Sequence, residues 1–270
     1  MISIGLGTIV GGNGSTLGGF SAEYQAVLTA GSGFTRPSSA EQTIQNKLIE
    51  DLKTAGIWSK LDAFYMFANN ITDSTGAFAR INWKNPTANY GSAAPNLPSI
   101  TAKGGFTGNG TNQGINLNLA ANAGTNFTSP NGSYGILVGT ISALSNNRLM
   151  GASGNSPVIN RIRKGTCSIA NTGTATGTIT IATGVSNSLF HLNLNSTEGR
   201  MYVNGSAGTS SAAVTFASDS QNWHILRYGD DATGFGNSQI RMAFVGGNLA
   251  AEASAFNTLI QNYITSVNAL

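Results

Sequence analysis

The chain has 270 residues, of which 40% are hydrophobic and only 9% are charged, and its formal net charge is +3. This length suits one large domain, or one domain with an appendage. The basic residues are mostly scattered, which argues against nucleic-acid binding. Low charge gives weak protection against association, so we expect a chain that packs against copies of itself or against other subunits.

Carboxylates are missing from the middle of the chain. No Asp or Glu occurs between Ser74 and Thr197, although acid–base catalysis, glycoside hydrolysis and calcium binding draw mainly on carboxylates. The single cysteine, Cys167, excludes an intrachain disulfide and a cysteine-ligated zinc site. His191 and His224 have no neighbouring ligands in the sequence. We therefore expect a binding or building protein without enzyme activity or a cofactor.

Residues 1–21 form a glycine-rich segment that also carries apolar side chains. The glycines disfavour a helix, and the apolar residues argue against a fully solvated tail. We expect an arm that becomes ordered on a neighbouring subunit, and a frayed terminus is the alternative. The segment lacks the basic start of a secretory signal, and no stretch of the chain is apolar enough for a transmembrane helix.

Residues 22–70 are predicted to form a helical N-terminal segment. Ser38 and Glu41 have the spacing of a capping box, and apolar residues then recur at helical spacing. Gly56 follows where a helix C-terminus is expected. The short aromatic run 63–67 predicts a buried strand at the end of this segment.

Residues 71–270 are predicted to form a β-sandwich. Short strands alternate with Gly, Asn and Ser turns, without interleaved helices, which indicates a two-sheet antiparallel sandwich. Alternation in 190–194 predicts one dry and one wet face, and Asn204-Gly205 predicts a tight turn. The apolar stripe in 256–267 predicts a C-terminal helix that covers the sandwich. The predicted strands are 77–83, 100–106, 114–119, 134–142, 148–151, 158–164, 177–182, 189–195, 200–204, 213–216, 223–228 and 240–245.

Aromatic and amide side chains offer a possible glycan site. A sugar needs an aromatic platform and hydrogen-bonding partners, but no tuned pKa. Each such aromatic residue, taken alone, is more typical of a core or an interface. The candidates are Trp83, Tyr90, Tyr134, Trp223 and Tyr228, with Asn109 among the abundant asparagines.

Two charged clusters have open interpretations. Asp230 and Asp231 lie in a Gly-Asp-Asp-Ala-Thr-Gly loop that could hold calcium weakly, although a solvated turn is the simpler interpretation. Arg161 and Arg163 precede Lys164 and would share one face of a strand. That face could bind an anionic glycan or a phosphate, or could simply keep the sheet soluble.

The C-terminal half resembles the last strands of a concanavalin-like (laminin-G-like) jelly roll. In that family a strand reads roughly Leu-Tyr-Val-Asn-Gly before a hairpin, and the final strand ends in Gly before a Leu-Ser-x-x-Glu helix start. Here the corresponding stretches are 189–195, the sequence Glu-Gly-Arg-Met-Tyr-Val-Asn-Gly at 198–205, and 240–252. Other segments are similar to virion proteins of bacteriophages that infect Bacteroidota-type hosts, namely 23–28, 45–62, 82–86 and 105–111.

The resemblance, which covers about residues 22–268, implies a jelly roll displayed on a virion as a spike, tail fibre or capsid-surface subunit. Its partners would be other virion subunits, further copies of itself (a trimer is common for such proteins) and a host-surface polysaccharide. Catalytic members of the wider group carry a Glu-x-Asp-x-x-Glu strand, which this sequence lacks. The alternatives are a stand-alone carbohydrate-binding module and a polysaccharide depolymerase that uses Asp219, Asp230 or Glu198 as acids.

Overall fold

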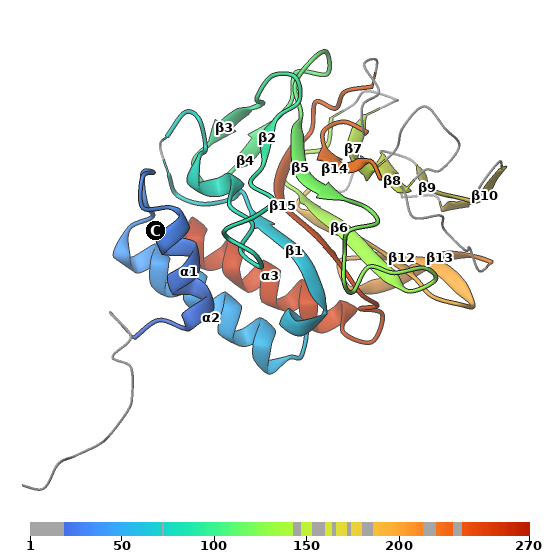
Figure 1. The fold of residues 1–270 in the computed structure, drawn as a ribbon, viewed down its shortest axis with the longest axis horizontal. Coiled ribbons are helices and arrows are strands. Elements are labelled where there is room, and N and C mark those ends of the chain that lie inside the picture. The colour runs from blue at the N-terminus through green and yellow to red at the C-terminus, as the bar shows by residue number, and fades with distance from the viewer. Residues whose placement is uncertain are drawn as a thin grey trace, which may run out of the picture.

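The structure, a computed structural model, describes residues 19–71, 73–142, 147–152, 160–163, 166–171, 174–179, 186–212, 220–228 and 234–270. Within these residues, helices and two antiparallel sheets form three layers (Figure 1). The longer helices are α1 (Ala22–Ala30), α2 (Ser39–Thr54) and α3 (Ala253–Asn268), and two short 3-10 turns are η1 (Trp58–Lys60) and η2 (Phe78–Arg80). No helix in this part of the chain is long and apolar enough to cross a membrane.

The two sheets, called sheet A and sheet B, confirm the predicted mainly β, two-sheet sandwich. Sheet A has the order β13 (Ser206–Ala212), β12 (Glu198–Val203), β11 (Ser188–Leu194), β6 (Gly132–Val138), β15 (Gln239–Gly246), β4 (Gly105–Thr107) and β3 (Ser99–Thr101), with β1 (Leu61–Met66) also paired to β15. Sheet B has the order β10 (Thr174–Ile179), β9 (Thr166–Asn171), β8 (Asn160–Arg163), β7 (Arg148–Ala152), β14 (Asn222–Ile225), β5 (Ile115–Ala120) and β2 (Ser92–Ala93).

Sheet A separates two hydrophobic cores. Along β11 the even-numbered apolar residues, such as Phe190 and Leu192, join an inner core between the two sheets. Leu189, on the opposite face of the strand, joins a helix-side core between sheet A and the helices. The alternation follows from the two-residue period of a strand. Because both faces of sheet A are covered, its central strands are buried on both sides, and β6 and β11 are buried throughout.

α2 and α3 form where the sequence predicted helices, α1 is a further helix within the predicted helical segment, and all three contribute to the core on the outer face of sheet A. Ser38 caps α2, accepting a hydrogen bond from the backbone N–H of Glu41 at 3.3 Å. The reciprocal half of the capping box is absent, because the Glu41 carboxylate instead accepts hydrogen bonds from the Asn70 backbone and the Gln45 side chain. α3 covers sheet A as expected, and its apolar stripe includes Phe256, which is fully buried.

The segment 22–70 is not separate from the sandwich. Its last element is β1, which pairs antiparallel with β15, so that Phe64 lies opposite Phe244. The Asp62 carboxylate on β1 also accepts hydrogen bonds from the backbone of Asn126 and Phe127, in the loop before β6. The N-terminal helices and strand therefore form one body with the sheets.

Several predicted strands differ from the structure. The stretch 77–83 forms η2, because Asp73 accepts hydrogen bonds from the backbone of Thr75 and Ala77 and starts a helical turn. The stretch 100–106 is split into β3 and β4 by a turn in which Lys103 has a φ of 61°. Sequence reasoning also missed β9 and β13. The predicted strand 213–216 lies outside the described residues.

The predicted turn at Asn204-Gly205 is confirmed, and it requires glycine for two reasons. Gly205 has a φ of +78°, and a Cβ there would lie 2.7 Å from the Ser254 Cα at the start of α3. Gly56 has a φ of +70° but has open space around it.

We therefore expect Gly56→Ala to cost about 1–2 kcal/mol from backbone strain alone. Gly205→Ala should cost clearly more, because overpacking adds about 1–3 kcal/mol. Urea unfolding of both variants measures the difference. Equal losses would contradict the close contact between the β12–β13 turn and α3.

Candidate functional site on the outer face of β12

The aromatic residues proposed from sequence as sugar platforms lie inside the protein. Tyr134 and Trp223 are 0% exposed and Tyr228 is 2% exposed. Trp83 is 1% exposed and packs in the helix-side core against Phe64. A sugar can stack only on a ring face that solvent reaches, so these four residues are core residues and the prediction is corrected. Alternate strand positions point between the two layers in this fold, and large aromatic side chains fill that space.

The other predicted ligands do not gather into a site within the described residues. Asn109 is exposed, but its Oδ1 accepts hydrogen bonds from the backbone of Thr111 and Asn112, so it closes the turn between β4 and β5. Arg161 and Arg163 lie on β8. Lys164 and the calcium candidates Asp230 and Asp231 lie outside the described residues. Among the residues that are described, no three His, Cys, Asp or Glu side chains come together to hold a metal ion.

A different row of side chains lies on the outer face of β12. Glu198, Arg200 and Tyr202 occupy alternate positions and therefore share one face, whereas Met201 points into the inner core. β12 and β13 lie at the edge of sheet A, where the turn at Gly205 meets the start of α3. In Figure 1 these two strands extend beyond the end of α3. The row is consequently only partly covered.

Arg200 and Glu198 form a bidentate ion pair. The Arg200 Nε lies 2.7 Å from Glu198 Oε1, and Nη2 lies 2.6 Å from Oε2. Both side chains keep about a third of their surface exposed (31% and 28%). Hydrogen bonds from Arg200, with a smaller contribution from Ser210, lower the pKa of the Glu198 carboxyl. Glu198 is thus held as a carboxylate, which suits hydrogen bonding to sugar hydroxyls and does not suit the general acid of a depolymerase.

Tyr202 supplies a partly exposed ring beside this ion pair. One face of the ring stacks on His191, with ring centroids 5.3 Å apart and an interplanar angle of 26°. The side chain is half-buried, and burial raises the pKa of its hydroxyl. No hydrogen bond joins this hydroxyl to another residue of the described chain. A rigid aromatic ring next to a charged hydrogen-bonding pair can contact both the apolar and the polar faces of a sugar.

The buried ring of His191 packs against one face of the Tyr202 ring. The predicted wet face of β11 is wrong here, because α3 covers it and leaves His191 only 1% exposed. The ring centroid of His191 lies 5.4 Å from that of Phe244 and 6.5 Å from that of Phe256 on α3. Neither ring nitrogen has a hydrogen-bond partner among the described residues, and burial lowers the pKa of His191 to about 3. The ring is therefore neutral and serves as packing for Tyr202.

In the stretch 198–205 the sequence predicted a strand, a turn and Glu198 as an acid of the depolymerase alternative, but it did not predict that Glu198, Arg200 and Tyr202 form a binding row. A usable signal was present, because Glu198, Arg200 and Tyr202 alternate with Gly199 and Met201. That pattern predicts one polar face and one buried face. It could not show that the polar face lies past the end of the covering helix.

Several solved structures have a fold similar to that of this chain. A Trypanosoma rangeli sialidase, solved with 2,3-difluoro-KDN, matches 83% of this chain and 40% of its own, with 13% identity and a TM-score of 0.52. The binding domain of Paraclostridial Mosquitocidal Protein 1 matches 76% of this chain and 53% of its own, with 14% identity and a TM-score of 0.52. The ligand-binding domain of botulinum neurotoxin serotype D, solved with N-acetylneuraminic acid, matches 76% of this chain and 52% of its own, with 14% identity and a TM-score of 0.50.

These likenesses show the fold alone. The chain is a two-sheet antiparallel β-sandwich, and it spans about half of the toxin chains and about two fifths of the sialidase chain. No protein-family model matches the sequence, and no curated protein sequence matches it.

Proposed function

We propose that this protein is a non-catalytic structural subunit of a bacteriophage particle, displayed on the particle surface as a spike, fibre or decoration, where its sandwich binds a host-surface glycan. The observation that carries the glycan part is the row of Tyr202, Arg200 and Glu198 on β12. It joins a supported aromatic ring to fixed charged hydrogen-bonding groups on a partly exposed face.

Two further observations support glycan binding. The botulinum neurotoxin ligand-binding domain, of which this fold matches about half, was solved with N-acetylneuraminic acid. The site also needs no proton transfer, which agrees with the shortage of carboxylates in the sequence. A stand-alone carbohydrate-binding module would use the same face, and only the particle experiment below separates the two.

Three of the described carboxylates, Asp62, Glu198 and Glu252, make structural contacts, which supports a non-catalytic role. Asp62 holds the loop before β6, and Glu252 pairs with Lys60 at 2.8 Å. Glu198 is neutralised by Arg200. A retaining or inverting glycosidase needs two carboxyl groups about 5–10 Å apart across a groove. Turnover of capsule or cell-wall polysaccharide by the purified chain would revive the depolymerase alternative.

Substitutions on β12 test the glycan site. In a glycan array with the full chain, Tyr202→Ala and Arg200→Ala should each weaken binding about tenfold or more, because ring stacking and charged hydrogen bonds each contribute about 1–2 kcal/mol. Tyr202→Phe keeps the ring and should retain most of the binding. Thr265→Ala, an exposed change on α3, is the control. Full binding by Tyr202→Ala, or no glycan bound by the unchanged chain, would contradict the site.

The particle role rests on composition and on the resemblance to virion proteins, and it has its own test. Mass spectrometry of purified phage particles should detect the chain in stoichiometric amounts, and a particle map should place the sandwich on the outer surface. Absence of the chain from the particles, with glycan binding intact, would favour the stand-alone binding module.

A further inference from the structure

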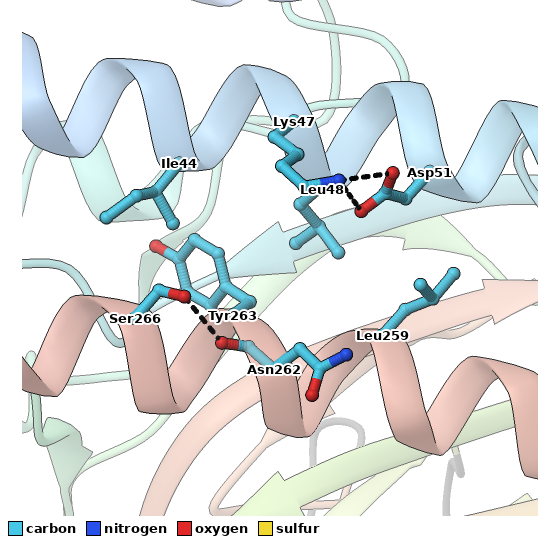
Figure 2. Close-up of a pocket in the computed structure, with 8 residues that line it drawn as sticks. All are labelled: Ile44, Lys47, Leu48, Asp51, Leu259, Asn262, Tyr263 and Ser266. Carbon is cyan, nitrogen blue, oxygen red and sulfur yellow. Dashed lines mark hydrogen bonds and ion pairs between the residues drawn. The ribbon is translucent and has the colours of Figure 1, made fainter.

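A groove runs along the solvent side of the helix layer, between α2 and α3. One pocket of about 50 Å³ lies between Ile44 and Leu48 on α2 and Leu259 and Tyr263 on α3. Figure 2 shows these side chains reaching into the space between the two helices. A second, shallower pocket of about 400 Å³ is lined by residues including Ala55, Ala255 and Leu259. Both pockets are lined by Leu259 and Asp51 and therefore adjoin each other, and together they are called the α2–α3 groove.

The groove carries almost no net charge. The two charged residues on its wall, Lys47 and Asp51, pair with each other at 2.8 Å. The whole of α3 contains no Asp, Glu, Lys or Arg, although its solvent face includes exposed positions such as Ala255 and Thr258. An exposed helix face normally carries charges, and interface cores are depleted of them. The surface of this helix therefore has the composition of a covered interface.

The sequence of residues 1–18 complements this groove. It contains no charged residue, and Ile2, Ile4 and Leu6 alternate with small residues. In an extended segment these three side chains share one face and span about 13 Å. The groove wall from Ile44 to Ala55 covers eleven helical steps, about 16 Å. An uncharged apolar segment thus matches, in length and chemistry, a mainly apolar groove whose two charged residues pair with each other.

Residues 1–18 are connected to the fold next to α2, so they could reach the helix layer of a second copy of the chain. The backbone N–H and hydroxyl of Ser21 both donate to Asn46 Oδ1 on α2, at 2.8 Å. Ser21, the first residue before α1, is therefore fixed to α2. Glycine-rich residues 11–19 separate Leu6 from this anchor. A spacer of this composition has the reach of a tether between subunits.

We infer that the α2–α3 groove of one copy binds residues 2–6 of a second copy of this chain. The low charge of the whole chain leaves little repulsion between copies. An exchange of arms between symmetric copies buries the apolar side chains of the arm and covers the uncharged face of α3. The inference concerns assembly and does not depend on glycan binding at β12.

Sedimentation of the full chain over a range of concentrations tests the inference. The chain should self-associate reversibly. Ile4→Asp with Leu6→Asp in the arm, and Ala255→Arg in the groove, should each raise the dissociation constant at least about tenfold, because each buries a charge without a partner. Combining the changes should add little, since both remove one interaction. Thr265→Arg adds the same charge to α3 outside the groove and should change association by less than about twofold.

A disulfide trap identifies the chain that supplies the arm. In a Cys167→Ser background, Ile4→Cys with Leu259→Cys should give covalently linked copies on a non-reducing gel. A disulfide formed within one chain would overturn the proposal, because the arm would then fill its own groove. A monomeric unchanged chain, or association unaffected by Ala255→Arg, would overturn it as well.

Discussion

Replacing Trp223 with alanine should lower the free energy of unfolding by about 3–5 kcal/mol, the usual cost of removing a large buried aromatic side chain. Trp223 is 0% exposed and lies at the centre of the inner core. Its ring centroid is 4.6 Å from that of Tyr134 and 5.4 Å from that of Phe127, and both contacts would be lost. Urea unfolding followed by circular dichroism measures the change.

Trp223→Phe is the matched control. Phenylalanine keeps an aromatic ring between Tyr134 and Phe127 and removes an indole N–H that has no hydrogen-bond partner within the described part of the chain. The loss of stability should therefore be clearly smaller than for alanine, and glycan binding should be unchanged. If Trp223→Phe folded normally but lost glycan binding, Trp223 would be a sugar platform after all, and the β12 site would be wrong.

Stability should fall as the solution is acidified below pH 6.5, and His191 should cause much of this fall. Burial lowers its pKa to about 3 in the folded state, against about 6.5 in the unfolded chain. Between these values the unfolded chain binds a proton that the folded chain excludes. The stability contributed by His191 is therefore complete above about pH 6.5 and is lost at about 1.4 kcal/mol per pH unit as the pH falls toward 3.

His191→Phe isolates this effect. Phenylalanine fits among Phe244, Phe256 and Tyr202 and cannot be protonated. The difference in unfolding free energy between the variant and the unchanged chain should grow from pH 7 to pH 4. The ion pair of Glu198 and Arg200 also weakens in acid, because the pKa of Glu198 is lowered, but it is present in both proteins and cancels in the difference. Parallel pH profiles would contradict the burial of a neutral His191.

Much of the fold could be predicted from local patterns. The cap at Ser38, the strand before Phe67, the turn at Asn204-Gly205 and the covering helix α3 all lie where the sequence placed them. Each of these features depends on interactions within a few residues or on a simple hydrophobic period. The stretch 77–83 was wrong because its apolar residues suggested a strand, whereas the Asp73 side chain, four residues before Ala77, accepts the Ala77 backbone N–H and starts a helical turn.

The candidate site could not be predicted in the same way. The indole rings of Trp83 and Trp223 are chemically well suited to stacking on a sugar. In the structure, however, Trp83 lies in the helix-side core and Trp223 in the inner core. Tyr202 is a single tyrosine in a polar strand. Its ring is suited to bind a sugar because it stacks on His191 of the neighbouring strand. Exposure is a property of the whole arrangement of layers, so no window of sequence contains it.

Composition and short-range periodicity were sufficient to predict a two-sheet sandwich of low charge with helical segments before and after it, because backbone hydrogen bonding and alternation of side chains are local. Which part of the outer face of the sandwich meets solvent depends on how far α3 extends over sheet A. That extent is set by packing between residues about sixty positions apart in the chain, such as His191 and Phe256. The same packing covers the expected wet face of β11 and leaves the Tyr202 row open on β12.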